Sequence, residues 1–298
     1  MKAAIDIGSN SLLLLVMDGD RVVHDEARVV GLGRGLGERG LFRPERMESA
    51  LAVLGEYAAR AQALGVPAAD VRAVATSASR RALNATSFYA QVLRQTGLHV
   101  RVIDGDEEAR LTWLGGVSGL ELPPGPVLLV DPGGGSTEVI LGEGGHVHRR
   151  VSLEIGTVRL TDRHLGYGAV EPSALARARA EIDAAFADVV LPVPPRAAIA
   201  VAGTATTLAA ASLGLLQYDP DVVHNSLLPA AALRAWIDRL LAAGPDERRA
   251  LVPVSPDRAD TLLIGACILL KALELTRRQA WRVSDRGLRY GVLSDPQT

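Results

Sequence analysis

Short apolar runs separated by turn sequences make up the start of the chain. Residues 3–7, 12–17 and 21–30 are rich in Ala, Ile, Leu and Val, and the runs are broken by Gly8-Ser9-Asn10 and Asp18-Gly19-Asp20. Glycine, asparagine and aspartate at such breaks are the residues that tight turns require. The pattern predicts three consecutive β-strands connected by short turns.

Helical and extended patterns alternate over the rest of the chain. In the first half we expect helices at 44–64, 80–96 and 106–118 and strands at 71–76 and 99–103. In the second half we expect strands at 127–131, 138–141, 146–154, 197–201 and 280–284, and helices at 172–188, from 204, at 229–242, at 257–275 and at 286–293. This order of strands and helices predicts an α/β fold.

The opening strand-loop-strand-strand unit occurs a second time in the sequence, at a constant offset of 125 residues. The offset places Asp6 on Asp131 and Ser11 on Ser136, without a gap between them. A repeat of this kind predicts two similar domains.

A proline-rich stretch, Pro123-Pro124-Gly125-Pro126, separates the two copies and is typical of a boundary between packed units. We therefore expect an N-terminal domain at 1–122 and a C-terminal domain at 123–285, with the last helix, 286–298, joining the first domain.

Charge and composition narrow the classes of partner. The 298 residues carry a formal net charge of -2, which argues against non-specific binding to nucleic acid or to a membrane surface. Lys2 and Lys271 are the only lysines, so arginines and backbone amides would have to bind any phosphate. The single cysteine, Cys267, lies in an apolar helical run and reads as a core residue. No signal-peptide pattern opens the chain, and we expect a cytoplasmic protein.

The two repeated loops share the pattern D-x-G-x-x-S, as Asp6-Ile7-Gly8-Ser9-Asn10-Ser11 and Asp131-Pro132-Gly133-Gly134-Gly135-Ser136. Glycines let backbone N–H groups turn toward a phosphate, and the small hydroxyl and amide side chains add donors. An aspartate beside a phosphate needs a divalent cation between them, and magnesium binds few carboxylates. Either loop alone could be an ordinary glycine-rich hairpin, but two copies in register favour a phosphate site.

Further polar groups occur where strands meet helices. Glu108 lies in an acidic cluster that opens a helix, which could simply complement the helix dipole, and Glu138 directly follows the second loop. Arg80 or its neighbour Arg81, at the start of the helix after the strand at 71–76, could bind one more phosphate. The corner at Gly203-Thr204 offers a third set of amides.

These motifs, taken together and in order, resemble the exopolyphosphatase/guanosine pentaphosphatase (Ppx/GppA) phosphatase family, within the superfamily of actin, sugar kinases and heat-shock chaperone ATPases. The stretches that carry the resemblance are AIDIGSNSLLLLV (4–16), ATSASRRALN (75–84), GDEEARL (105–111), VDPGGGSTEV (130–139), EIGTVRLT (154–161), AGTATTLAA (202–210), DRADTLLIGACIL (257–269) and VSDRGLRYGVL (283–293). The length resembles the short, two-domain members. The resemblance implies two similar ribonuclease H-like, actin-like domains with a ligand cleft between them.

The resemblance also implies a mechanism and a set of site residues. Glu108 would activate water and Glu138 would position it or bind metal, while Asp131 and Asp6 would bind Mg2+ or Mn2+. The phosphate ligands would be Ser9, Asn10, Ser11, Arg80, Gly133, Gly134, Gly135, Ser136, Thr137, Gly203 and Thr204. The substrate would be polyphosphate or a guanosine penta- or tetraphosphate, and the protein could form a homodimer. Pro132 stands where the family usually has an apolar β-branched residue.

Two other functions stay open on the sequence. A phosphotransferase of the same superfamily would need an adenosine-binding Gly-Gly pair, and residues 201–210 contain only Gly203. An actin-like scaffold or alarmone sensor would need phosphate ligands but no base. The presence of both Glu108 and Glu138 therefore favours hydrolysis.

Overall fold

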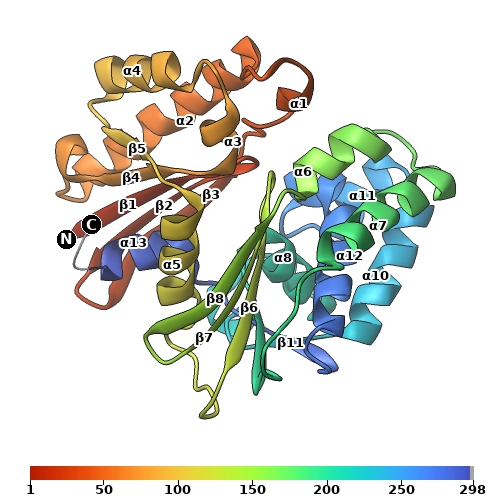
Figure 1. Cartoon of the computed structure of the whole chain (residues 1–298). Helices are drawn as coiled ribbons and strands as arrows, with labels where there is room; N and C mark the ends of the chain where they lie inside the picture. The colour runs from red at the N-terminus through yellow and green to blue at the C-terminus, as the bar shows by residue number, and fades with distance from the viewer. Residues whose placement is uncertain (296–298) are drawn as a thin grey trace. The chain divides into compact units, whose positions relative to one another are not determined.

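The structure is a computed structural model that describes residues 1–295, apart from the side chains of residues 38 and 39. The chain divides into two compact units (Figure 1). Unit 1 is Met1–Gly115 together with the chain from Leu288 onward, and unit 2 is Gly116–Gly287. The chain thus passes from unit 1 to unit 2 at the end of helix α5 (Gly105–Gly116), before the proline-rich stretch at which the sequence suggests a boundary.

Unit 1 is built on a mixed five-stranded sheet with the strand order β3-β2-β1-β4-β5. Its strands are β1 (Lys2–Ile7), β2 (Ser11–Asp18), β3 (Arg21–Val29), β4 (Arg72–Ala75) and β5 (Val100–Val102). The first three form an antiparallel meander, and β4 and β5 continue the sheet in parallel with β1. Its helices are α1 (Leu36–Arg39), α2 (Pro44–Ala63), the short 3-10 helix η1 (Ala68–Asp70), α3 (Ser77–Arg81), α4 (Ala85–Thr96), α5 and α13 (Leu288–Ser294).

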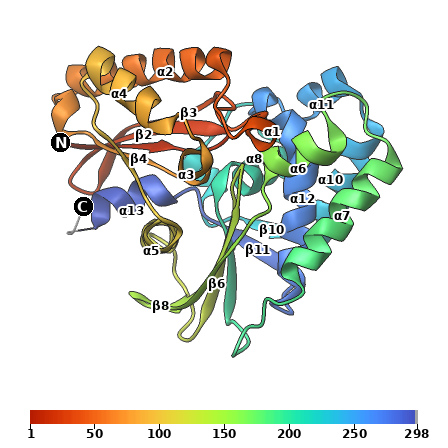
Figure 2. The ribbon, with the colours of Figure 1, turned by 45° about the horizontal axis from the view of Figure 1, so that its top comes forward.

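Helices cover both faces of this sheet (Figure 2). On one face, α2 and α4 bury a cluster that includes Ile5, Leu14, Leu54 and Phe88. On the other face, α5 and α13 pack over a smaller cluster, whose members are Ala4, Leu15, Val74, Ile103, Leu111, Leu288, Tyr290, Val292 and Leu293. Burial of apolar surface on both sides is what holds a mixed sheet of this kind.

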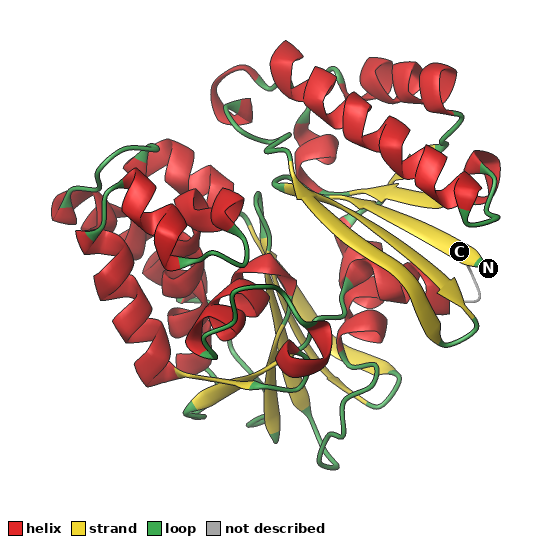
Figure 3. Cartoon of the chain, turned by 180° about the vertical axis from the view of Figure 1, so that it is seen from behind, coloured by secondary structure: helices red, strands yellow, loops and turns green. Residues whose placement is uncertain are grey.

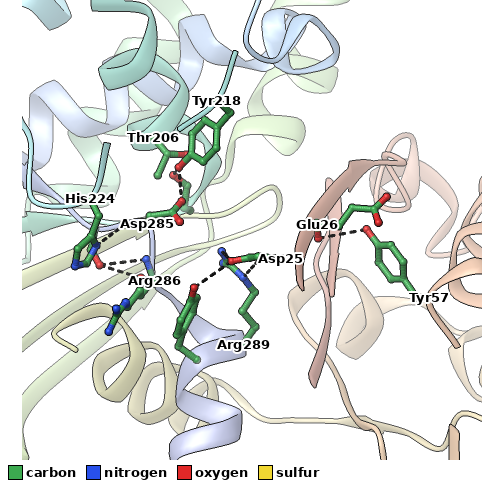
Figure 4. Close-up of polar contacts among 12 residues, drawn as sticks. Asp25, Glu26, Tyr57, Thr206, Tyr218, His224, Asp285, Arg286 and Arg289 are labelled. Carbon is green, nitrogen blue, oxygen red and sulfur yellow. Dashed lines mark hydrogen bonds and ion pairs between the residues drawn. The ribbon is translucent and has the colours of Figure 1, made fainter. Parts of the chain in front are cut away.

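Helix α13 comes from the far end of the chain and is fixed to unit 1 by an ion pair. Arg289 donates to both carboxylate oxygens of Asp25 on β3, with Nε···Oδ1 at 2.9 Å and a second contact at 2.8 Å (Figure 4). The hydroxyl of Tyr290 donates to the same carboxylate at 3.1 Å. Arg72 also donates to the carbonyl oxygen of Val292. These contacts join segments more than 200 residues apart in sequence.

Unit 2 is built on a six-stranded sheet with the order β10-β11-β9-β6-β7-β8. Its strands are β6 (Val127–Pro132), β7 (Thr137–Glu143), β8 (His146–Leu153), β9 (Ala197–Ala200), β10 (Leu227–Pro229) and β11 (Ala280–Val283). Its helices are α6 (Thr157–Leu160), the π-helix η2 (Thr161–Leu165), α7 (Pro172–Phe186), α8 (Ala202–Ser212), α9 (Pro220–Val223), α10 (Ala230–Ala242), α11 (Pro245–Leu251), η3 (Pro256–Arg258) and α12 (Ala259–Glu274).

The main core of unit 2 lies between one face of the sheet and a layer of helices (Figure 3). Leu128, Val130 and Val139 from the strands pack against this layer, in which α12 is buried along nearly its whole length. Cys267 belongs to α12 and is buried, as expected of a core residue. None of the helices within residues 1–295 has the length and apolarity needed to span a lipid bilayer.

The repeat seen in the sequence is present in the structure with the same strand register. Asp6 lies opposite Leu13 in the β1-β2 pair, and Asp131 lies opposite Glu138 in the β6-β7 pair, so the offset of 125 residues holds for both members of each pair. The register shift at Val16/Met17 also recurs at the same offset, at Leu141/Gly142. The expectation of two similar α/β domains is therefore confirmed.

Some elements differ from the sequence-based expectation. The helix expected at 80–96 is two helices, α3 and α4, separated at Ala82–Asn84. The side chain of Asn84 causes the break, because it accepts a hydrogen bond from Phe42 N–H and donates one to Phe42 O. The sequence analysis also missed several short elements, which are α1, α6, η2, α9, β10 and α11.

Candidate active site in two phosphate loops

The loop between β1 and β2 forms a tight turn in unit 1. The N–H of Gly8 donates to the carbonyl of Ser11 at 3.0 Å, and a Cβ on Gly8 would lie 3.1 Å from that carbonyl oxygen. Ser9, Asn10 and Ser11 are all buried, and Asn10 Oδ1 and Ser11 Oγ have no hydrogen-bond partner. Because buried polar atoms normally have partners, these two atoms are available to water or to a ligand at the loop.

Glu108 of unit 1 is connected to this loop through hydrogen bonds. It lies in the first turn of α5 and receives a hydrogen bond from Arg80 Nη1 at 2.6 Å, and Thr76 also hydrogen-bonds to it. The N–H of Thr76 in turn donates to the carbonyl of Ile7, the residue directly before Gly8. A chain of contacts thus connects Glu108 to the start of this loop.

Burial raises the pKa of Glu108 above the usual value of a glutamate, although Arg80 and Thr76 act in the opposite direction. The residue is only 8% exposed, so removal of water from the charged carboxylate is the dominant effect. A raised pKa makes a carboxylate a better proton acceptor, because proton transfer from water becomes less unfavourable. Glu108 therefore has the environment of a general base.

Arg80 was expected to bind phosphate, and the structure gives it a different contact. One of its terminal nitrogens bonds both Glu108 and the carbonyl of Ile103, the latter at 3.1 Å. The arginine therefore fixes the position of the candidate base. Its predicted role as a phosphate ligand stays a prediction.

The loop between β6 and β7 repeats the turn of unit 1. A Cβ on Gly133 would lie 3.0 Å from the carbonyl oxygen of Ser136, nearly the distance found at Gly8. Helix α6 supports the loop, since the N–H of Thr157 donates to Gly133 O and the N–H of Val158 to Gly134 O. The hydroxyl of Thr137 donates to the carbonyl of Ile155, so this side chain is turned to the segment between β8 and α6.

Two carboxylates lie opposite each other beside this loop. Asp131 and Pro132 are the last two residues of β6. Asp131 is paired with Glu138 of β7, so the side chains of Asp131 and Glu138 lie on the same face of the sheet at neighbouring positions. Glu138 is buried and accepts a hydrogen bond from Ser152 Oγ at 2.9 Å. Like charges directly opposite each other destabilise a sheet, which a bound cation would offset.

Carboxylate oxygens are the ligands that Mg2+ or Mn2+ prefers, and magnesium commonly binds one or two of them together with water and phosphate oxygens. Asp131 and Glu138 fit this donor set. In unit 1, Asp6 occupies the position equivalent to Asp131, but its partner is the apolar Leu13. No group of three or more His, Cys, Asp or Glu side chains suited to a metal ion is found in residues 1–295, apart from the side chains left undescribed.

The third predicted phosphate corner is at the start of α8. Ala202 has a φ of 66°, a conformation that favours glycine, and the guanidinium of Arg258 covers Gly203 so closely that a Cβ there would be 1.7 Å from one of its nitrogens. Thr204 is buried, and its side chain packs on Gly265 of α12. The corner thus brings Arg258 to Gly203. The sequence analysis did not identify Arg258 as a site residue.

The structure therefore groups the predicted residues by unit. Unit 1 joins Ser9, Asn10 and Ser11 with Glu108, through Thr76, and unit 2 joins the glycine loop with Asp131 and Glu138. The sequence analysis did not predict the contacts of Thr76, Ser152 and Arg258. Thr76 and Arg258 lie inside motifs that carry the resemblance, but nothing in a single sequence says which side chains they meet.

Comparison with known proteins identifies the family of this chain. Residues 16–297 match the Ppx/GppA phosphatase family. The chain belongs to this family. It is 36% identical over 296 residues to Exopolyphosphatase 2 of Mycobacterium tuberculosis, covering 93% of this chain and 91% of the relative.

Solved structures of the Ppx/GppA family have the same fold. The crystal structure of the Aquifex aeolicus family member is 35% identical, with a TM-score of 0.79 over 98% of this chain and 95% of that one. An exopolyphosphatase-like protein of known structure is 32% identical, with a TM-score of 0.90 over 98% and 97% of the two chains. The chain therefore has the two-domain actin-like fold of the family, and the expected enzyme class, a phosphatase hydrolase, is confirmed.

Proposed function

We propose that this Ppx/GppA phosphatase removes the terminal phosphate from polyphosphate by attack of water, with guanosine pentaphosphate as a second substrate. The observation that carries the proposal is Glu108, a buried carboxylate with a raised pKa that is connected through Thr76 to a phosphate-type loop. The name of the relative from Mycobacterium tuberculosis supports polyphosphate as the substrate.

Glu108 takes the proton of the attacking water in this proposal. Arg80 holds its carboxylate at 2.6 Å and keeps part of the negative charge compensated in the resting enzyme. Hydrolysis of a phosphoric anhydride mainly requires positioning and neutralisation of charge, and the base only has to orient and deprotonate the water. A glutamate kept in place by an arginine and a threonine meets this requirement.

Asp131 and Glu138 of unit 2 would hold the divalent cation, and the role of Asp6 as a metal ligand stays a prediction. When bound, Mg2+ or Mn2+ would neutralise phosphate oxygens and so make the phosphorus easier to attack. Ser152 orients Glu138 through its hydroxyl and lowers the freedom of that side chain. The amides and hydroxyls of the two loops would bind phosphate oxygens, as in other glycine-rich phosphate sites.

The proposal is tested by phosphate release from long-chain polyphosphate and from guanosine pentaphosphate, measured side by side with magnesium. We expect wild type to release phosphate, and Glu108→Gln to lose at least about 100-fold in kcat because a general base typically contributes 10²–10⁴-fold. The matched control is Glu107→Gln. Glu107 is the adjacent carboxylate of α5 and pairs with the exposed Arg101 at 2.6 Å.

The ratio of the two rates ranks the substrates. Full turnover in Glu108→Gln would refute the role of this residue, and equal losses in Glu107→Gln and Glu108→Gln would show a general effect on α5. Absence of release from both substrates by wild type would refute hydrolysis of these compounds. Chelation of divalent cations with EDTA should abolish release, and added Mg2+ or Mn2+ should restore it.

A further inference from the structure

Helix α6 begins beside the β6-β7 loop, and its backbone is bonded to that loop. The N–H groups of Val158 and Arg159 both donate to the carbonyl of Gly134, each at 3.0 Å. Gly134 belongs to the glycine-rich turn of the loop, so the side chain of Arg159 starts from a backbone position in contact with this turn. An arginine is thus placed next to the loop by backbone hydrogen bonds alone.

The guanidinium of Arg159 is turned toward Glu154, five residues earlier in the chain. Its Nη1 donates to the carbonyl of Glu154 at 2.8 Å, and its Nη2 lies 2.5 Å from the Glu154 carboxylate. Nε and Nη2 are nevertheless buried and have no aligned hydrogen-bond acceptor within the described part of the chain. Glu154 therefore compensates the charge of Arg159 but leaves the donors on one edge of its guanidinium unsatisfied.

The two partners of this ion pair differ in their exposure to water. The side chain of Arg159 is 12% exposed, whereas that of Glu154 is 69% exposed. An exposed carboxylate can leave an ion pair at little cost because water solvates it, but a buried N–H group without an acceptor is costly. Glu154 can therefore be displaced from the pair, while Arg159 stays in place and still requires an acceptor.

The unsatisfied edge of Arg159 has the chemistry that a phosphate requires. The N–H groups of Nε and Nη2 can form two parallel hydrogen bonds to two oxygens of one anion. The adjacent loop belongs to the glycine-rich type that binds phosphate through backbone amides. Arg163, four residues further on, is a poorer candidate, because it is 51% exposed and pairs with Glu181 rather than with any group of the loop.

We propose that Arg159 binds a phosphate group of the substrate at the β6-β7 loop, and that this phosphate displaces the carboxylate of Glu154. The inference rests on the proposed function and names a further ligand of the same site. Without substrate, Glu154 keeps the charge of the guanidinium compensated. With substrate, the phosphate competes with Glu154 for Arg159, so the affinity for the substrate is lower than the loop and the arginine alone would give.

The first test is Arg159→Gln, assayed with polyphosphate. We expect KM to rise about tenfold, the effect of losing one charge-assisted hydrogen bond, while kcat stays within about twofold because the contact is equal in ground and transition states. The matched control is Arg163→Gln, which removes the exposed arginine of the same segment and should leave KM unchanged. Equal KM in wild type and Arg159→Gln would overturn the proposal.

The second test is Glu154→Gln, for which a purely structural role of the pair predicts the opposite sign. If Arg159 and Glu154 only brace the segment before α6, loss of the carboxylate should weaken binding and raise KM. If Glu154 competes with phosphate, KM should fall about threefold, as expected from the small contribution of an exposed ion pair. A raised or unchanged KM in Glu154→Gln would contradict the competition.

Two further variants separate competition for Arg159 from a general effect of negative charge. Glu181→Gln removes a carboxylate that contacts Arg163 and His164, and it should leave KM unchanged. In the double variant Glu154→Gln/Arg159→Gln, KM should equal that of Arg159→Gln alone, because nothing is left to compete for. A gain in affinity that persists without Arg159 would assign the effect to charge alone and overturn the proposal.

Binding measured without turnover keeps this inference separate from the proposed reaction. Calorimetric titration of Glu108→Gln with sodium tripolyphosphate should show about tenfold weaker binding when Arg159→Gln is added, and tighter binding when Glu154→Gln is added. Equal affinities in these three proteins would overturn the role of Arg159. Failure of wild type to release phosphate would overturn only the proposed reaction, since the titration still tests the binding site.

Discussion

The surroundings of Glu108 shift its pKa in two opposite directions. Burial favours the neutral acid and dominates, while Arg80 and Thr76 favour the carboxylate. A base must be deprotonated to work, so activity should fall as the pH falls through the pKa of Glu108. Because that pKa is raised, the acid limb of the pH profile should lie above the range of an ordinary glutamate.

Replacement of Arg80 should change the pKa of Glu108 in one direction. Arg80→Gln removes an interaction that lowers the pKa of Glu108, so the pKa should rise further and the acid limb of kcat/KM should move to higher pH. The check is the pH profile of kcat/KM for wild type and Arg80→Gln. Arg101→Gln is the control, since it removes the exposed ion pair of Glu107 on the same helix and should leave the profile in place. A profile of Arg80→Gln that coincides with wild type would contradict this coupling.

The sequence identified the chemical groups of the site better than it identified their partners. Asp6 and Asp131 were selected because the repeat places them at equivalent positions, and Glu138 because it directly follows the second loop; their roles stay predictions. Arg80 was assigned to phosphate on the basis of its place at a strand-helix junction, yet it contacts Glu108, 28 residues away in sequence. The pairing of Arg80 with Glu108 depends on how α3 and α5 pack against each other. The pattern of neighbouring residues in the sequence does not contain this information.

At the scale of elements, each of the two repeated loops is shaped by the segment that follows the third strand of its meander. In unit 2 this segment approaches the loop at Gly156, where a Cβ would lie 2.5 Å from the carbonyl oxygen of Gly134. The N–H of Arg159 also donates to that carbonyl, at 3.0 Å. The contact is backbone against backbone, so no side-chain rotation can relieve an added methyl group.

Gly156→Ala should therefore displace the second phosphate loop. We expect a loss of about 1–3 kcal/mol in the free energy of unfolding, typical of overpacking, together with a raised KM for polyphosphate. Urea unfolding and steady-state kinetics measure the two effects. Gly145→Ala, in the β7-β8 hairpin, is the matched control because a Cβ there meets nothing within 4 Å. Equal free energies of unfolding for Gly156→Ala and Gly145→Ala would contradict this prediction, because they would show that the loop can move without loss of stability.

The helices and strands were largely predictable from the sequence where the pattern of apolar residues is long. The strands of both meanders and the helices α2, α7 and α12 follow from runs of apolar residues bounded by turn sequences. The break between α3 and α4 was not predictable, because it depends on the contact of Asn84 with Phe42, 42 residues earlier. Elements as short as α9 and β10 bury too few residues to leave a periodic pattern.

At the scale of the whole molecule, unit 1 is discontinuous and depends on α13 for one face of its sheet. The pair of Asp25 with Arg289 is a polar attachment of that helix, in which Arg289 is 8% exposed and Asp25 is more accessible. Removal of Asp25 would take away two hydrogen bonds to the charged guanidinium of Arg289.

Asp25→Asn should accordingly destabilise unit 1 by about 2 kcal/mol, whereas Tyr290→Phe, which loses one hydrogen bond, should cost about 1 kcal/mol. Trp113 is the tryptophan of unit 1, and Trp236 and Trp281 belong to unit 2. Denaturant unfolding followed by Trp113 fluorescence, with the other two replaced by Phe, reports on unit 1 separately. A midpoint unchanged by Asp25→Asn would show that α13 is held by its apolar contacts alone.

The late position of α13 has a consequence for synthesis. Unit 2 is one continuous segment, and all of it leaves the ribosome before Leu288 does. At roughly 5–20 residues per second, the sheet of unit 1 waits for tens of seconds or less with Ala4, Leu15 and Val74 lacking one of the two helices that cover them. The half of the enzyme that is made first is therefore completed last, and the part of the sheet face that awaits α13 is the surface that a chaperone would bind in the nascent chain.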